Sequence, residues 1–147
     1  MRYLKLFEAF DESRVDEFME IIKDKVLDLS DIGFNVEVED KNSEPLLEDM
    51  IRITIERTGL NKAFQFKECS YQVSDILLTN IEIGLYKTVH VTVQPAFREN
   101  HQSDRLSWEF VQGEEEARWS FENKRISWAN PLNLSLTRVE IFFENLK

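Results

Sequence analysis

The chain of 147 residues contains few of the residue types on which many catalytic and metal sites depend, with one cysteine, two histidines and four glycines. A single cysteine excludes an intrachain disulfide or a Cys-x-x-Cys pair, and it fits a reducing compartment. The sequence also lacks a glycine-rich phosphate loop, a Gly-x-Ser-x-Gly elbow and a His-Glu-x-x-His motif. The commonest nucleotide, hydrolase and zinc-protease sites are therefore excluded, and we expect no cofactor.

Long apolar runs are absent as well. The opening MRYLKLFEAF is interrupted by Lys5 and Glu8, so it is too short and too charged for the core of a signal peptide. No later run approaches the length of a membrane span. Apolar residues still make up 42% of the chain, which is enough to bury a core. We therefore expect a single cytoplasmic domain over residues 1–147, without membrane association.

Positive charge is scarce in the first third of the chain. The formal net charge is −10, and residues 1–50 alone hold 15 Asp and Glu against 6 Lys and Arg, a net charge of −9. A negative field of this kind repels nucleic acid and anionic lipid surfaces. The charge distribution disfavours direct binding of either and favours a basic protein partner.

Two segments have helical patterns. Over residues 13–30, apolar side chains recur at steps of three and four, which predicts an amphipathic helix with Asp11 or Ser13 as its N-cap and Gly33 at its end. The preceding residues 3–10 are mixed, and we expect three of them to touch the core: Leu6, Phe7 and Phe10. Residues 68–83 fit a helix ending at Gly84, although β-branched residues at 81–83 would also suit a strand.

The remaining segments alternate between apolar and polar residues, as half-buried strands do. Residues 34–39 and 51–56 are expected to be antiparallel neighbours. A change of phase at Thr137–Arg138 predicts either a β-bulge or a break in the strand. Further strands are expected at residues 88–93, where Pro95 stops the run, in a hairpin of 106–110 with 117–121, at 126–128, and at 134–143. The whole pattern predicts an α+β fold, with an antiparallel sheet of about seven strands, an N-terminal amphipathic helix and a second helix packed on one face.

An acidic row is the most unusual feature of the first predicted helix. Its members are spaced four residues apart: Glu12, Asp16, Glu20, Asp24 and Asp28. On a helix each step rises about 6 Å, and like charges at this spacing repel, so the row lowers helix stability. Glu37 and Glu39 on the next strand would extend it. We hypothesise that this anionic surface binds a basic partner.

The alternative is a solvated helix face, which is what most charge runs are. Three basic residues can offset the acids through pairs at i,i+3: Arg14, Lys23 and Lys25. The row also has only about half the linear charge density of a DNA strand, and it winds about 40° around the helix at each step. It therefore turns away from a flat partner, although a groove could follow it.

One weak enzymatic pattern is present. Glu122 and Lys124 share a strand end, and Asp104 lies one hairpin upstream. This spacing resembles the Asp…Glu-x-Lys site of metal-dependent nucleases. Glu39 and Lys41 repeat the same dipeptide spacing by chance, and the Pro-Asp that precedes this motif is missing. A nuclease is therefore kept as an alternative to a non-enzymatic binding protein.

The remaining reactive and aromatic residues have simple explanations. His90 lies on the polar side of a strand and His101 in a loop, so both are expected to be solvated. Cys69 is expected to be a small buried residue. The three tryptophans fall on the apolar sides of successive predicted strands and are expected to form a core cluster rather than a base-stacking platform: Trp108, Trp119 and Trp128.

Two segments resemble proteins of a viral group. MRYLKLFEAF resembles the Leu-Lys-Leu-Phe-Glu-x-Phe opening of many small tailed-bacteriophage proteins. The stretch from Val26 to Val38 is similar to a helix–Gly-Phe–strand passage in the same uncharacterised group. The resemblance covers about a quarter of the chain, and it implies a phage origin and a bacterial host cytoplasm but no activity.

The sequence therefore favours a small acidic interaction protein that binds a basic host protein, with inhibition of a nucleic-acid-binding or defence factor as one role consistent with it. Two other classes stay open. One is the nuclease that would use Asp104, Glu122 and Lys124. The other is a structural virion component or homo-oligomer, in which apolar strand edges would matter more than charge.

Overall fold

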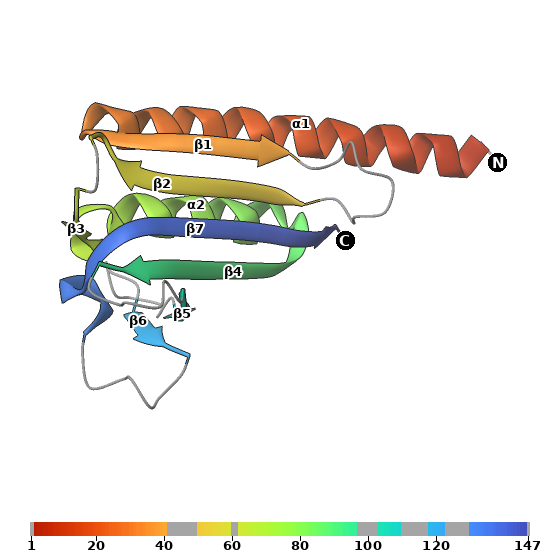
Figure 1. Ribbon diagram of the computed structural model, residues 1–147. Helices are drawn as coiled ribbons and strands as arrows, with labels where there is room; N and C mark the ends of the chain where they lie inside the picture. Colours follow the sequence, from red (N-terminus) through yellow and green to blue (C-terminus); the bar gives the residue numbers. More distant parts are fainter. Residues whose placement is uncertain are drawn as a thin grey trace.

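The computed structural model describes residues 2–40, 50–59, 62–96, 103–109, 118–122 and 130–146, and the side chains in these ranges except those of residues 2–13, 40 and 146. Within these residues, seven strands form an antiparallel sheet, and two α-helices pack against each other and against the sheet (Figure 1). The predicted α+β class, with its N-terminal helix and second helix, is confirmed.

The first helix is longer than predicted. α1 spans Arg2–Asp31, so neither Asp11 nor Ser13 caps it and the expected start near residue 13 is wrong. Residues 3–12 contain Leu, Lys, Glu and Ala, which favour helix, and no Gly or Pro that would interrupt it. The side chains of Leu6, Phe7 and Phe10 lie outside the described part, so their expected core contacts stay predictions. Gly33 follows the helix with φ 95°, as expected for its end.

The order of the strands in space differs from their order in the sequence. The sheet runs β1-β2-β7-β4-β5-β6, with the short β3 also paired to β7. β7 therefore lies between β2 and β4, near the middle of the sheet. The strands are β1 (Phe34–Asp40), β2 (Ile51–Arg57), β3 (Phe64–Gln65), β4 (Tyr86–Pro95), β5 (Asp104–Glu109), β6 (Arg118–Phe121) and β7 (Ser135–Leu146).

Pairings expected from alternation are confirmed. β1 and β2 are antiparallel neighbours, with Val36 opposite Ile55. β5 and β6 form the predicted hairpin, with Leu106 opposite Phe121. The two-residue β3 was not predicted, because two residues are too few to show alternation. The expected strand at residues 126–128 lies outside the described part.

The change of phase in the last strand is a bulge rather than a break. Gln94 on β4 pairs with Arg138, but the next residue, Pro95, pairs with Leu136, so Thr137 has no partner on β4. The extra residue lets both Leu136 and Val139 face the core although their numbers differ in parity. Pro95 ends β4, where its missing N–H is tolerated.

The second helix resolves the ambiguity at residues 68–83 in favour of helix. α2 spans Ser70–Ile83, preceded by a short 3-10 helix at Phe66–Glu68. Gly84 caps α2 in the left-handed conformation at φ 68°, and its N–H donates to the Asn80 carbonyl at 2.7 Å. Ile81 and Ile83 are therefore helical, and Ile81 is exposed.

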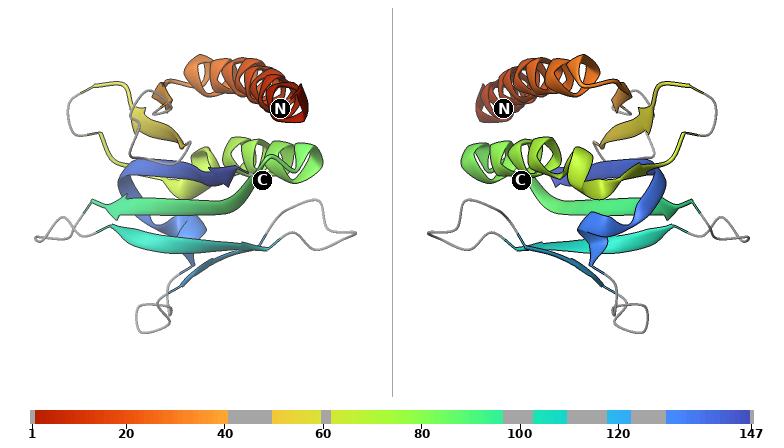
Figure 2. Two further views of the ribbon diagram at one scale, coloured as in Figure 1. Left: turned by 90° about the vertical axis from the view of Figure 1, so that its right-hand side faces the viewer. Right: turned by 90° about the vertical axis from the view of Figure 1, so that its left-hand side faces the viewer.

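Both helices lie on the same side of the sheet, so in the described part of the chain one face is covered by helices and the other, which we call the open face, has no helix on it (Figure 2). The core fills the space between helices and sheet and includes Phe18 of α1, Ile76 of α2, Ile53 of β2 and Phe143 of β7, all without solvent exposure. Among the described residues, no helix has both the length and the apolarity needed to cross a membrane.

Candidate functional site: an acidic helix and the surfaces around it

The acidic row of α1 faces solvent. Its described side chains, Asp16, Glu20, Asp24 and Asp28, are all exposed, and so are Glu17 and Asp31 beside them. We call these six residues the acidic face. The opposite side of the helix is buried through Val15, Phe18, Ile22 and Leu29. The fifth predicted member, Glu12, lies on α1, but its side chain is outside the described part.

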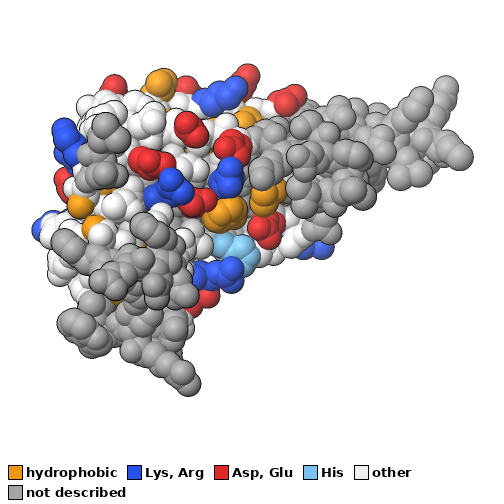
Figure 3. Space-filling view, viewed as in Figure 1, with side chains coloured by type: hydrophobic (Ala, Val, Ile, Leu, Met, Phe, Trp, Pro, Cys, Tyr) orange, Lys and Arg blue, Asp and Glu red, His pale blue; other side chains and the backbone are white. Residues whose placement is uncertain are grey.

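The row crosses α1 diagonally. Four residues advance the helix by about 40° beyond a full turn, so the three steps from Asp16 to Asp28 turn through roughly 120°. The far end reaches α2, because Asp28 and Asp31 line a hollow of about 290 Å³ with Lys25, Tyr71 and Asp75. Acidic side chains follow the upper rim of the molecule in Figure 3, over α1.

Two of the three α1 cations expected to offset the row, Arg14 and Lys25, have partners outside α1. Arg14 donates from Nη2 to the Ile83 carbonyl oxygen at 2.5 Å, and Lys25 Nζ binds Asp75 Oδ2 at 2.7 Å. Both partners belong to α2 or its end, so two of the three expected i,i+3 offsets are not formed. Within the described part of the chain, no carboxylate of the acidic face forms an ion pair. Tertiary packing thus leaves the surface more negative than the composition of the helix implies.

Glu37 and Glu39 do not extend the same surface. Both alternate with Val36 and Val38, which pack toward the core, so the two glutamates lie on the open face of the sheet. Glu39 Oε2 accepts from Arg52 Nη2 at 2.5 Å across the strand pair. β1 therefore separates them from the acidic face, and the single anionic surface expected from the sequence is two surfaces.

The open face of the sheet carries mixed and largely paired charge. Arg138 binds Glu56 at 3.1 Å and approaches Glu140 at 3.8 Å, and His90 lies 3.9 Å from Glu144. Acidic and basic side chains accordingly lie next to one another over the central strands in Figure 3. This half-buried face has the character of a solvated sheet surface, and His90 is one of its ordinary members. His101 lies outside the described residues.

Two of the three residues of the nuclease alternative, Asp104 and Glu122, lie on opposite sides of the β5–β6 hairpin. Leu106 pairs with Phe121, so Asp104 shares the Leu106 side of β5, whereas Glu122 lies opposite Arg105 on the other side. The Glu122 carboxylate is 3.8 Å from Arg105 Nε. Lys124 is outside the described residues. In the part of the chain that the structure describes, no group of acidic, histidine or cysteine side chains is arranged to hold a metal.

Two of the tryptophans have the structural role expected of them. Trp108 and Trp119 pair across the hairpin with ring centroids 6.4 Å apart. Trp119 is buried and packs edge-on against Phe66 at 4.8 Å. They form part of the core rather than an exposed stacking platform, while Trp128 lies outside the described residues.

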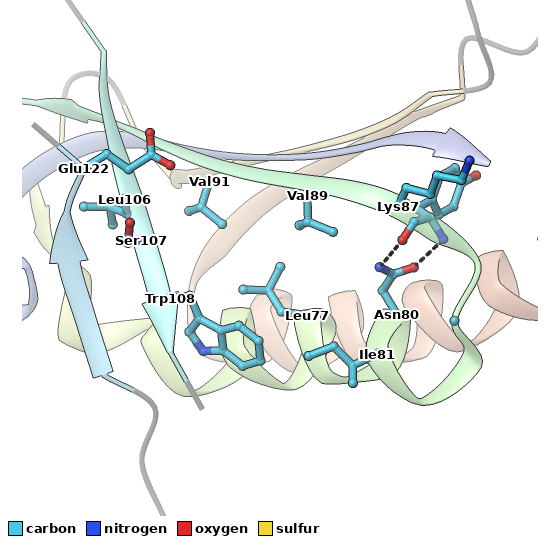
Figure 4. Close-up of a pocket in the computed structure, with 12 residues that line it drawn as sticks. Leu77, Asn80, Ile81, Lys87, Val89, Val91, Leu106, Ser107, Trp108 and Glu122 are labelled. Atoms are coloured by element: carbon cyan, nitrogen blue, oxygen red, sulfur yellow. Dashed lines mark hydrogen bonds between the residues drawn. The ribbon is translucent and has the colours of Figure 1, made fainter. Parts of the chain in front are cut away.

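A groove beside α2 was not predicted from the sequence. Its volume is about 490 Å³, and its apolar walls include Leu77 and Ile81 of α2, Val89 of β4 and Trp108 of β5. Val89 points toward Leu77, and Trp108 lies beside α2, in Figure 4. The groove arises where the sheet extends past the cover of α2, and this depends on the order of strands in space rather than on any local pattern.

The polar groups around this groove suggest no chemistry. Both polar atoms of the Asn80 side chain bond to the backbone of Tyr86. Nδ2 donates to the Tyr86 carbonyl at 3.1 Å, and Oδ1 accepts from the Tyr86 N–H at 3.0 Å. Lys87 and Glu122 lie at opposite ends of the groove (Figure 4). A ligand would meet apolar walls and two distant charges, which provide no acid–base pair for catalysis.

Cys69 is fully buried next to α2, as expected for a structural residue. Burial, and to a smaller extent the charge of Glu68, raises the pKa of its thiol from the ordinary value of 9.0 to about 12. Because the thiolate is the nucleophile, a buried thiol with this pKa is inert near neutral pH.

We expect Cys69 to resist iodoacetamide in the folded protein at pH 8 and to react once urea unfolds the chain. Since its folded pKa is the higher one, the thiol contributes stability below about pH 9, and this contribution is lost as the pH rises from 9 towards 12. Urea unfolding at several pH values measures how the free energy of unfolding changes with pH. The Cys69→Val variant should lack the part of this change that comes from the thiol. If iodoacetamide labelled Cys69 in the folded protein as fast as it labels a free thiol, the result would contradict the burial of this residue.

No family model, curated protein or solved structure gives a significant match to this chain.

Proposed function

We propose that this chain is a non-enzymatic interaction protein whose acidic face binds a basic surface of a protein partner. One observation carries the proposal: six exposed carboxylates lie on one side of α1 without ion pairs in the described part, while Arg14 and Lys25 are held by α2. Carboxylates at this spacing repel one another and lower helix stability. A basic partner would relieve that repulsion, and attraction between the opposite charges would speed its association with this surface.

The shape of the acidic face indicates which partner it suits. The row turns around α1, so a concave basic surface can contact more of it than a flat one. Proteins that bind nucleic acid present such basic grooves. We therefore propose a nucleic-acid-binding or defence protein as the partner, and the resemblance to phage proteins suggests a bacterial host as its source.

The triple variant Asp16→Lys, Glu20→Lys and Asp24→Lys should lose partner capture from bacterial lysate. If each reversal costs on the order of 1 kcal/mol of binding free energy, affinity falls roughly a hundredfold. Because all three side chains are exposed, circular dichroism and the urea midpoint should stay close to those of the wild type. Pull-down followed by titration calorimetry with the identified partner measures the loss.

A matched control reverses three exposed acids away from α1: Glu82, Glu109 and Glu122. It changes the net charge by the same amount and should retain capture. Binding to the wild type should also weaken with salt, since the Debye length falls from about 10 Å at 0.1 M to about 3 Å at 1 M. If the α1 triple variant still captures the partner, the proposal is wrong. Light scattering and a search for the protein in purified particles test the rival proposal of a structural component.

A further inference from the structure

β1 forms one free edge of the sheet. No described strand lies beyond it, and it pairs with β2 along all seven of its residues without a register shift. The opposite edge of the described sheet is β6, with four described residues. Edge strands are often protected by proline, a bulge or charged side chains; β1 has no proline, lysine or bulge, and the charges it carries are all acidic. The edge is therefore long, regular and able to accept another strand.

The register shows which backbone groups face outward. The Gly33 carbonyl accepts from the Thr58 N–H at 3.2 Å, which makes residues 33 and 58 a hydrogen-bonded pair. Such pairs alternate along an antiparallel ladder, so Glu37 and Glu39 bond toward β2. Val36 and Val38 then direct their N–H and C=O groups away from β2, to the free edge. Their half-buried side chains pack against the core, and both helices lie on one side of the sheet (Figure 2).

Charge decides which strand this edge can accept. In an antiparallel pair of two copies of β1 over its full length, the central residue, Glu37, would lie directly opposite Glu37 of the second copy. Like charges in that position are destabilising. Glu37 is exposed, lies opposite Thr54 on its inner side, and forms no ion pair within the described residues. The edge therefore disfavours a second copy and favours a strand with basic residues opposite Glu37 and Glu39.

We propose that β1 pairs with an extended partner segment in which basic and apolar residues alternate. One basic side chain would contact Glu37 on the open face, and another would share Glu39 with Arg52, which already donates to it. The apolar side chains would continue the row of Val36 and Val38. Backbone hydrogen bonds would supply affinity, and the alternation would supply specificity. This inference rests on the proposed function, because it describes a second contact with the same basic partner.

The test uses a synthetic, end-capped peptide of eight residues with alternating lysine and valine, and measures its binding by fluorescence anisotropy. Val38→Pro removes one outward N–H without breaking a bond to β2, whereas Val38→Ala removes side-chain packing but keeps the amide. We expect Val38→Pro to bind at least about tenfold more weakly than Val38→Ala, as the loss of one or two backbone hydrogen bonds implies.

A second arm does not depend on the folding of a variant. A peptide of the same charge, with proline in place of its two central valines, cannot form a strand and should bind wild-type protein at least about tenfold more weakly. Equal binding of the two peptides, or of the two Val38 variants, would overturn the inference. So would a wild-type dimer that Val38→Pro dissociates in light scattering. Because the acidic-face reversals leave β1 intact, their result tests the proposed function separately.

Discussion

Replacing Phe18 with alanine should lower the free energy of unfolding by about 3–5 kcal/mol, the range for removing a buried aromatic ring. Phe18 has no solvent exposure and lies between two rings of the sheet. Its ring centroid is 5.6 Å from that of Tyr86 and 5.2 Å from that of Phe143. It therefore joins α1 to β4 and β7, and its loss leaves a cavity that three elements would have to fill. Urea denaturation measures the change.

Tyr71 supplies the matched control. It is an aromatic residue on α2 with 73% of its surface exposed. Tyr71→Ala removes a ring of similar size from solvent rather than from the core, so we expect a change within about 0.5 kcal/mol. If Phe18→Ala were as mild as Tyr71→Ala, α1 would not be packed on the sheet through this residue.

The Asn80→Leu substitution should cost about 2–5 kcal/mol, because it removes two hydrogen bonds to buried backbone groups. Asn80 is only 5% exposed, and its amide bonds both the N–H and the carbonyl of Tyr86. These bonds hold the last turn of α2 to the first residue of β4. Leucine has a similar size, so the loss reports the hydrogen bonds rather than a cavity. Thermal and urea unfolding both measure it.

Asn133→Leu makes the same replacement at an exposed position in the short 3-10 helix Pro131–Asn133. It should change stability by less than about 0.5 kcal/mol. A similar cost for both substitutions would show that leucine is poorly tolerated in general, and that the bonds to Tyr86 contribute little.

Local patterns predicted much of this fold. The three- and four-residue spacing from Val15 to Leu29 defined the buried side of α1, and alternation defined the pairing of β1 with β2. Even the bulge at Thr137 was visible as a change of phase, because a one-residue insertion moves every later side chain to the other face. Each of these features depends on residues that are close together in the chain.

The features that the sequence did not predict depend on distant residues. Arg14 and Lys25 could have paired with acids one turn away, but their partners lie 69 and 50 residues later in the chain. Likewise, Glu37 and Glu39 have the charge of the acidic row but point to the opposite face of the sheet. The sequence therefore predicted which acidic residues belong to the candidate site. Only the tertiary structure shows which of their charges stay unpaired among the described residues.

The position of β7 has a consequence for how the chain can fold during synthesis. β7 is the last of the strands in the sequence, yet it joins β2 on one side to β4 on the other. The β1–β2 hairpin and the strands from β4 to β6 can form on the ribosome, but nothing described connects them in the sheet until Ser135–Leu146 has been made. Their facing edges stay open until then, so a pause in translation before residue 135 would expose two unpaired strands to aggregation.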